Sequence, residues 1–344
     1  MQIPHALELK RTHYLSRRRI IRIAILCSFF IIIIFLSSTF FLNRSQKYDI
    51  VSTNFSDCPL CSNLNQSSET SGNSTPNDLV LCGVFGKEKL AFPFIRTLRS
   101  VGCKAHVVFV SNKTMKNKHK QFFKKCGVEL FIMVSPKNTN TMYPHSLRYI
   151  GYQQYLKQTK YRFNRILHAD SFDVFFQKDP FNENISTNSL NFVLEDILII
   201  NSSWNSGWLQ RAYGEEMPIK MGNNIVSCSG TIIGGAKQFK IYLNTLLGHK
   251  PFWLNGRHSL DQAYHNYLLY SKKFERNGIK PKFFSCNSPI LTMHYCFRRG
   301  NEHYTNERVL CPDGRTVPSI VHQYNLFEDA QYILHRICPK LKKI

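Results

Sequence analysis

The chain has 344 residues, with 45 Lys and Arg against 22 Asp and Glu and a formal net charge of +23. Because 43% of the residues are hydrophobic and only 19% are charged, the composition excludes a wholly disordered chain and a collagen-like repeat. A basic excess of this size is typical of nucleic-acid binding, so the position of the charge along the chain decides its meaning.

The first predicted element is a membrane-spanning helix over residues 23–42. This run carries no charge, and at about 1.5 Å rise per residue it spans about 30 Å, the thickness of a bilayer core. A cleaved signal peptide is the alternative, but its apolar region is usually about 7–15 residues long and ends in small residues. Here the run is longer and ends in Phe40, Phe41 and Leu42.

Basic residues before this run set the predicted topology. Residues 1–22 hold six basic residues and one acidic residue, so the positive-inside rule places them in the cytosol as a tail of charge +5. The remaining 39 basic and 21 acidic residues give +18 on the lumenal side. No nucleic-acid partner is expected there, and the basic surface would face anionic nucleotides, acidic glycans or the membrane surface, or be a solvated face.

Residues 43–77 are predicted to form a flexible, glycosylated stem. Sixteen of residues 44–77 are Ser, Thr or Asn, so the segment lacks the apolar surface that offsets the entropy cost of ordering. Asn54, Asn65 and Asn73 each begin an Asn-x-Ser/Thr acceptor site. Their clustering after the membrane segment agrees with a compartment of the secretory pathway.

Ten of the eleven cysteines follow residue 42, and an even number in an oxidising compartment predicts disulfides. Cys58-Pro-Leu-Cys61 resembles a redox or zinc pair, but no second pair stands at metal spacing. We therefore expect either a bond between these two cysteines or a bond between two stems. The second arrangement would give a homodimer.

Residues 78–344 are predicted to form one globular lumenal domain of the α/β class. Apolar runs bounded by turn residues predict strands over 78–86, 105–110 and 128–134, separated by helices over 96–101 and 116–125. This alternation indicates a mainly parallel sheet with helices on both faces. Ligands bind such sheets at the carboxyl ends of the strands.

Two carboxylates mark the most informative segment. After a predicted helix over 144–157 with Ser146 as its cap, a short strand over 166–169 leads directly to Asp170 and then Asp173. Carboxylates flanked by buried hydrophobic residues need compensation. They would form a structural ion pair with a basic residue, act as general acid and base, or hold a divalent cation through their oxygens, and the spacing alone leaves all three open.

This segment resembles the metal-binding motif of nucleotide-sugar glycosyltransferases with the GT-A fold. In that family an apolar strand precedes Asp-x-Asp, a few apolar residues and a turn containing Asp-Pro. Asp173 stands six residues before Asp179-Pro180, as the second acid of the motif does, whereas the first acid is displaced to Asp170. The resemblance implies that Asp173 binds the metal and that Asp170 contacts the donor ribose, or the metal through water.

The resemblance extends over about residues 78–327. Arg148 corresponds to a helix arginine near the donor, although an ion pair on the helix face is the alternative. The run Cys228-Ser-Gly-Thr-Ile-Ile-Gly234-Gly235 resembles the small-residue strand beside the donor sugar, where Gly234 and Gly235 would let the backbone approach the ligand.

Two further motifs complete the resemblance. Leu260-Asp261-Gln262, with Asn266 four residues beyond, resembles a motif of glycogenin-like and plant-cell-wall transferases and implies a catalytic Asp261 that orients an acceptor hydroxyl or flanks the anomeric carbon. His322 resembles the histidine of a C-terminal strand that completes the metal site, although it could be a hydrogen-bonded structural histidine. Trp204 and Trp208 would stack on a sugar or pack in the core.

The family implies a Golgi type II membrane enzyme that transfers a hexosyl or pentosyl group from a UDP-sugar or another nucleotide sugar to a glycan or glycoprotein, with retention. The cofactor would be Mn²⁺, because two carboxylates and an imidazole suit an ion that accepts oxygen and nitrogen ligands, with Mg²⁺ as the alternative. Two alternatives stay open. One is a non-catalytic, membrane-anchored glycan-binding or chaperone-like protein on the same scaffold. The other is a basic module that binds acidic polysaccharide.

Overall fold

The computed structural model describes residues 55–62, 64, 73–137, 142–182, 184–254, 259–297 and 302–341. All of them belong to one unit, Ile50–Ile344. Among these residues no helix has both the length and the apolar character needed to span a bilayer. The predicted cytosolic tail, 1–22, and the predicted membrane segment, 23–42, lie outside the described residues.

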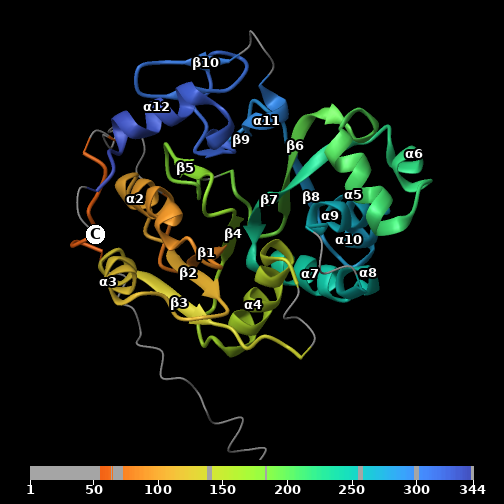
Figure 1. Ribbon diagram of the computed structural model, residues 1–344, viewed down its shortest axis with the longest axis horizontal. Helices are drawn as coiled ribbons and strands as arrows, with labels where there is room; N and C mark the ends of the chain where they lie inside the picture. The colour runs from red at the N-terminus through yellow and green to blue at the C-terminus, as the bar shows by residue number, and fades with distance from the viewer. Residues whose placement is uncertain are drawn as a thin grey trace, which may run out of the picture. The chain divides into compact units, whose positions relative to one another are not determined.

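A seven-stranded sheet forms the centre of this unit (Figure 1), and its strands run in the order β3-β2-β1-β4-β7-β6-β8. The strands are β1 (Asp78–Gly83), β2 (His106–Ser111), β3 (Val128–Ile132), β4 (Arg165–Ala169), β6 (Leu190–Leu198), β7 (Ile225–Gly235) and β8 (Pro281–Phe284). Strand β7 runs antiparallel to β4 and to β6, whereas the other four neighbouring pairs are parallel. The predicted α/β fold with a mainly parallel sheet is therefore confirmed.

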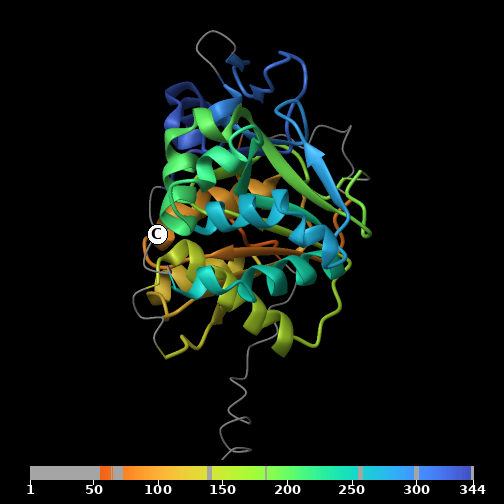
Figure 2. The same cartoon turned by 90° about the vertical axis from the view of Figure 1, so that its right-hand side faces the viewer.

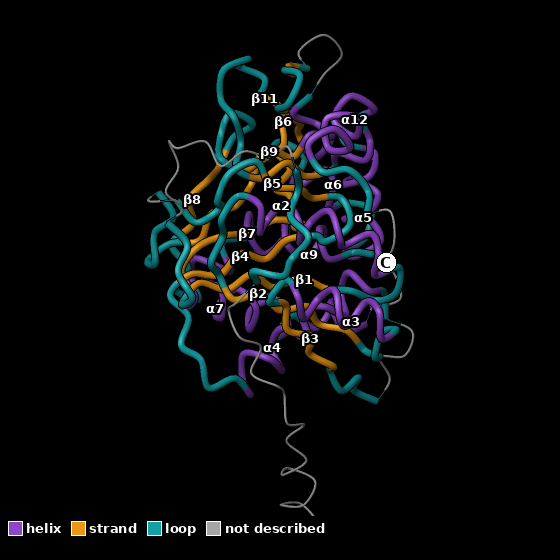
Figure 3. Tube along the Cα trace, turned by 90° about the vertical axis from the view of Figure 1, so that its left-hand side faces the viewer, coloured by secondary structure: helices purple, strands orange, loops and turns teal. Residues whose placement is uncertain are grey.

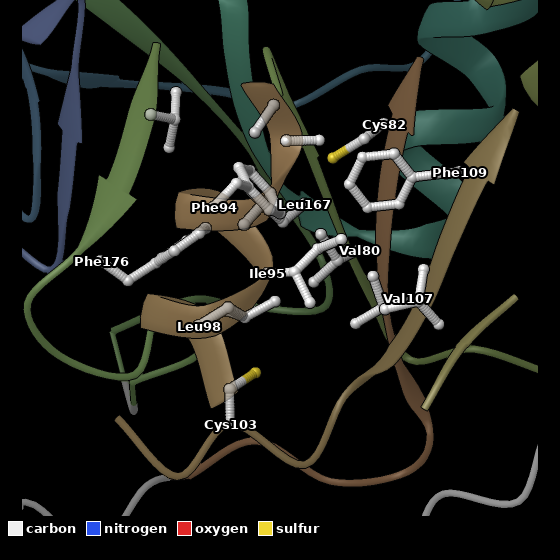
Figure 4. Packing of buried hydrophobic residues seen from close by; sticks show 14 of the residues in the cluster. Val80, Cys82, Phe94, Ile95, Leu98, Cys103, Val107, Phe109, Leu167 and Phe176 are labelled. Carbon is white, nitrogen blue, oxygen red and sulfur yellow. The ribbon is translucent and has the colours of Figure 1, made fainter. Parts of the chain in front are cut away.

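Helices cover both faces of the sheet (Figures 2 and 3) because both faces of its strands are apolar. Alternate residues of β1 and β2, such as Val80 and Val107, contact α2 (Phe92–Ser100) and α3 (Asn117–Lys125). Figure 4 shows Phe94, Ile95 and Leu98 of α2 facing these strands.

The opposite face of the sheet carries α4 (Pro144–Gln158) and α7 (Ala236–Leu247). Close packing there depends on small residues, since a Cβ atom on Gly151 would lie only 3.0 Å from Cβ of Val110. Two predictions about these helices were wrong, namely the first residue of α2 and the capping residue of α4. Helix α2 begins at Phe92, with Pro93 in its first turn, rather than at Arg96. Helix α4 begins at Pro144, so Ser146 lies within its first turn and is not its cap.

A smaller sheet lies beside the central one and consists of β5 (Val174–Phe176), β12 (Ile320–His322) and β9 (Ile290–Thr292). Strand β12 is antiparallel to β5 and parallel to β9. It belongs to a second core cluster that includes Phe175, Leu291 and Val321 together with residues of α12 (Glu328–Ile337). This arrangement brings the C-terminal part of the chain to the end of β4.

The remaining elements are mostly short, and all except η1 lie in the second half of the chain. They are η1 (Glu88–Ala91), η2 (Ile199–Asn201), α5 (Ser203–Tyr213), α6 (Met217–Met221), α8 (Lys250–Leu254), α9 (Asp261–Tyr270), α10 (Lys273–Arg276), α11 (Met293–Cys296), β10 (His303–Tyr304), β11 (Val309–Leu310) and η3 (Tyr324–Leu326).

Disulfides attach part of the predicted stem to the domain, which corrects the expected pairing. Cys58 bonds to Cys126 at the end of α3, and Cys61 bonds to Cys338 just after α12. Both stem cysteines are buried, and the segment around them lies beside the C-terminal end of the chain in Figure 1. A bond between Cys58 and Cys61 was therefore the wrong prediction, and neither thiol is left for a bond between two stems.

Only part of the cysteine prediction holds within the described residues. A third disulfide joins Cys286 to Cys296. Four cysteines (Cys82, Cys103, Cys228 and Cys311) are buried thiols outside any disulfide. Figure 4 shows why two of them do not pair, because Cys82 and Cys103 lie at opposite ends of the core cluster around α2.

Candidate metal site and its cavity

The two predicted acids lie in the loop that follows β4, at the carboxyl end of that strand. The backbone N–H of Asp170 donates to the carbonyl of Gly230 in β7 (2.8 Å). The hydroxyl of Ser171 donates to the carbonyl of Gly83 at the end of β1 (2.8 Å). The loop is thus held by the strands on both sides of β4, which fixes the direction in which its carboxylates point.

Strand pairing brings His322 to the same place. In the smaller sheet His322 lies opposite Val174, the residue next to Asp173. The chain then turns sharply at Gln323, whose φ of 62° lies in the left-handed region. The backbone N–H of Gln323 donates to the carbonyl of Asp173 (2.8 Å). A non-glycine residue in this conformation is a form of backbone strain that is found at functional sites.

Asp170, Asp173 and His322 together form a group of side chains with the donor set of a metal site. One ligand atom from each lies within 4.8 Å of the others. The Nε2 atom of His322 is 3.3 Å from Oδ2 of Asp170 and 3.7 Å from Oδ2 of Asp173. His322 is only 1% exposed, whereas both carboxylates are partly open to the cavity.

These side chains fit a divalent cation on two observations. First, Nε2 of His322 is buried and makes no hydrogen bond of acceptable geometry, although it points at the two carboxylates. Second, a Cβ atom on Gly230 would lie 2.5 Å from Oδ2 of Asp170 and 2.6 Å from Cε1 of His322, so glycine leaves this space open. Two carboxylate oxygens and one imidazole nitrogen suit Mn²⁺ better than Mg²⁺, because Mg²⁺ prefers oxygen ligands alone.

The other ring nitrogen of His322 faces a polar shell that the sequence did not reveal. Nδ1 lies 3.5 Å from Oγ1 of Thr292 and 3.6 Å from Sγ of Cys228. Glu195 of β6 is buried on the same side, and burial raises the pKa of its carboxyl to about 7. Contacts to the second nitrogen fix the orientation of a ligating imidazole.

The protonation of the group without a cation follows from its crowding. Burial would raise the pKa of Asp170, but Arg148 and His322 lower it well below its usual value. Burial raises the pKa of Asp173, and the charge on Asp170 adds to this rise. Burial would lower the pKa of His322, but Cys228 and the two carboxylates raise it well above its usual value. The group therefore retains protons that a cation would displace.

Arg148 lies at the centre of an ion-pair network rather than on an open helix face. From α4, its Nη1 atom contacts Oδ1 of Asp170, and its Nη2 atom is 3.0 Å from Oδ2 of Asp261. Burial would lower the pKa of Arg148, but these carboxylates raise it well above its ordinary value. Arg148 also lines the cavity. Through its two ion pairs it connects the predicted donor-site residue Asp170 to the predicted catalytic acid Asp261.

Asp261 occupies the first position of α9, where a carboxylate is favoured by the helix dipole. Its Oδ2 atom also accepts a hydrogen bond from Ser229 (3.2 Å). Helix α9 is attached to β7 through Asn266, whose amide accepts from the N–H of Ser227 (2.9 Å) and donates to its carbonyl (2.8 Å). The Asn266 of the motif therefore holds the helix in place.

The two predicted glycines lie at the wrong end of β7. Gly234 and Gly235 pair with Ile166 and Arg165 at the start of β4, and neither lines the cavity. They serve packing, because a Cβ atom on either would collide with backbone of residues 187–190. Gly230 is the glycine that faces the acids, at an irregularity where β7 departs from its register with β6. Such bulges commonly lie beside active sites.

Asp170, Asp173 and His322, which we call the metal group, line a cavity of about 1180 Å³. Its wall includes the predicted residues Arg148, Asp170, Asp173, Asp261 and His322. Trp208 of α5 and the basic residues Lys87, Lys89 and Lys340 also line it. One cavity therefore combines the three side chains that could hold a cation with several basic side chains.

No protein-family model matches the chain, and no curated protein matches it either.

Proposed function

We propose that the protein is a metal-dependent glycosyltransferase of the GT-A type, which transfers a sugar from a nucleotide donor to a glycan or glycoprotein. The single observation that carries the proposal is the meeting of Asp170, Asp173 and His322 at the carboxyl end of β4, inside the cavity. These residues come from two distant parts of the sequence, and the family resemblance implies that all three lie at the donor site.

The cavity has the size and charge for a nucleotide sugar. Small-molecule sites are clefts of about 300–1,000 Å³, so this cavity leaves room for an acceptor beside the donor. A bound divalent cation would stabilise the negative charge that develops on the leaving diphosphate. Lys87, Lys89 and Lys340 supply further positive charge on the same wall.

The chain's own residues take distinct roles in this proposal. Asp170, Asp173 and the Nε2 atom of His322 bind the cation. Arg148 holds Asp170 and Asp261 in fixed positions through its two terminal nitrogens. Asp261 orients an acceptor hydroxyl or flanks the anomeric carbon, and the proposed outcome is retention of its configuration.

The membrane and compartment assignments belong to the same proposal. The uncharged run at 23–42 would anchor the enzyme in the Golgi membrane, with the described unit in the lumen. The three disulfides support an oxidising compartment, because such bonds persist there and are rare in the cytosol.

The test is a panel of nucleotide sugars, with and without Mn²⁺, in which the released nucleotide is measured. We expect release from at least one donor, loss of release with a chelator, and a fall of at least about 100-fold for Asp173→Asn. NMR of the product would report the anomeric configuration.

Asp313→Asn is the matched control, because Asp313 is exposed and outside the cavity. Donor turnover that survives both chelation and Asp173→Asn would reject the metal role. Absence of turnover with every donor, together with glycan binding, would favour the non-catalytic glycan-binding protein.

A further inference from the structure

Two tryptophans stand together on α5 at the edge of the cavity. Trp204 and Trp208 are four residues apart, so they lie on the same face of the helix. Their ring centroids are 6.0 Å apart and their planes are inclined by 39°. Trp208 lines the cavity that holds the metal group, whereas Trp204 is 61% exposed. Paired indoles at the edge of a cavity, one of them mostly exposed, are typical of a binding surface.

The same helix face is open next to the indoles. Gly207 lies between the two tryptophans in sequence, and a Cβ atom placed on it would meet nothing within 4 Å. Apart from the adjacent residues and the backbone of the helix itself, no described atom therefore occupies the position next to this glycine. We call Trp204, Gly207 and Trp208 the tryptophan platform.

The platform is fixed relative to the proposed chemistry. Oδ1 of Asn205, the residue after Trp204, accepts a hydrogen bond from Nε2 of Gln262 (2.8 Å). Gln262 follows Asp261 in α9, and both residues line the cavity with Trp208. The aromatic surface and the polar groups that face the metal site thus belong to one rigid pair of helices.

We propose that the tryptophan platform binds a pyranose ring of an oligosaccharide, the acceptor of the reaction. A pyranose has C–H groups on its faces and hydroxyls around its edge. An indole face is apolar and carries negative charge density, so it stacks on those C–H groups. Gln262 and Asp261 supply hydrogen-bonding groups at the inner side. The word acceptor rests on the proposed function, but the glycan site itself does not.

A flat hydrophobic contact with a protein or a membrane is the competing use of this face. Ile219 of α6 is 75% exposed, and Ile200 of η2 is also exposed. Neither isoleucine lines the cavity, whereas Trp208 does. An occupant that contacts both indoles must therefore reach past Trp204 into the cavity, which suits the end of a glycan chain better than a flat surface.

The chain offers a direct optical test because it has only three tryptophans. The third, Trp253, lies in α8, is outside the cavity lining and donates its indole N–H to the carbonyl of Leu247 (2.6 Å). The full chain in detergent, without metal or nucleotide, is titrated with chitotetraose, N-acetyllactosamine and mannotriose. Tryptophan fluorescence and calorimetry report binding.

We expect at least one oligosaccharide to bind and to change the fluorescence. Trp204→Ala and Trp208→Ala should each raise its Kd at least about tenfold. Trp253→Phe and Ile219→Ser should leave the Kd unchanged. Gly207→Gln should also weaken binding, because the glutamine side chain would cover the platform. Glutamine is a better helix former than glycine, so the helix should be retained. This variant therefore tests the platform without removing a large side chain.

Several results would overturn the proposal. One is that none of the three oligosaccharides binds, and another is that the platform variants bind them as well as the unaltered chain does. A third is that Ile219→Ser weakens glycan binding while the protein binds vesicles, or a second copy of itself, through Trp204. Glycan binding that needs the platform, without turnover of any nucleotide sugar, would reject the proposed function alone. Turnover with an acceptor KM that is unchanged in the platform variants would reject this inference alone.

Discussion

Arg148 and Asp261 are 113 residues apart in sequence, yet Nη2 of Arg148 lies 3.0 Å from Oδ2 of Asp261 inside the protein. The same guanidinium contacts Asp170, so one buried cation balances two carboxylates from different elements. Through these two ion pairs, Arg148 joins α4 to the loop after β4 and to the first residue of α9.

Replacing Arg148 with Met keeps much of the side-chain volume but leaves the two carboxylates without their cation. We expect a loss of about 3–5 kcal/mol in the free energy of unfolding, since removing one partner of a buried ion pair leaves uncompensated charge. Urea denaturation measures the change. Arg162→Met is the control, because Arg162 is exposed and should change stability by less than about 0.5 kcal/mol. Equal effects of the two variants would contradict the structural role of the network.

Gly230→Ala should weaken cation binding with little effect on the fold. The added Cβ atom would lie 2.5 Å from Oδ2 of Asp170 and 2.6 Å from Cε1 of His322, so the ligands must move apart. Calorimetric titration with Mn²⁺ should show a Kd at least about tenfold higher than that of the unaltered chain. Gly207→Ala, whose Cβ enters open space, should leave the Kd unchanged. Normal Mn²⁺ affinity in Gly230→Ala would place the cation elsewhere.

His265 should make the fold sensitive to acid. Burial lowers the pKa of His265 to about 3, and its neutral ring is held between Ser227 (2.9 Å) and Tyr242 (3.0 Å). In the unfolded chain the ordinary pKa is about 6.5, so below that pH the unfolded state gains a proton that the folded state does not. The stability contributed by the neutral ring is therefore present at pH 7 and is lost as the pH falls below about 6.5.

This prediction is measured as a difference between two pH values. Between pH 7 and pH 5 His265 alone should cost the fold about 2 kcal/mol. His265→Gln removes the titrating group, so its unfolding free energy should fall less over the same interval. An identical pH slope in the two proteins would show that the pKa of His265 is the same in the folded and unfolded states, which would contradict the prediction.

The bond between Cys61 and Cys338 should stabilise the unit more than the bond between Cys286 and Cys296. The first joins residues 277 apart and the second residues only 10 apart, and a longer closed loop removes more entropy from the unfolded chain. Replacing both cysteines of the long loop with Ser should lower the free energy of unfolding by about 2–5 kcal/mol. The matched pair of Ser substitutions in the short loop should cost less, as read from thermal midpoints.

The early strands could be predicted because their sequences are unambiguous. Residues 105–110 are apolar at nearly every position, and the structure buries β2 on both faces. The position of His322 beside Asp173 required the pairing of β12 with β5, which joins segments about 150 residues apart and which the sequence indicated only through a family resemblance.

Other features could not be read from the sequence for physical reasons. The choice of Gly230 rather than Gly234 depends on a register shift in β7, and the pattern of small residues is the same either way. Glu195 and Thr292 are ordinary strand residues until the fold places them beside His322. The partners of Cys58 and Cys61 depend on where α3 and α12 end.

The disulfides of Cys58 and Cys61 determine how proteolysis can divide the chain. A single peptide-bond cleavage anywhere between Cys58 and Cys338 leaves the two fragments covalently joined, because each cut falls inside at least one closed loop. A protease that cuts at residues 65–72 would nick the chain without freeing the rest. Only cleavage before Cys58 separates the N-terminal segment from the domain, and the larger fragment then retains both bonds.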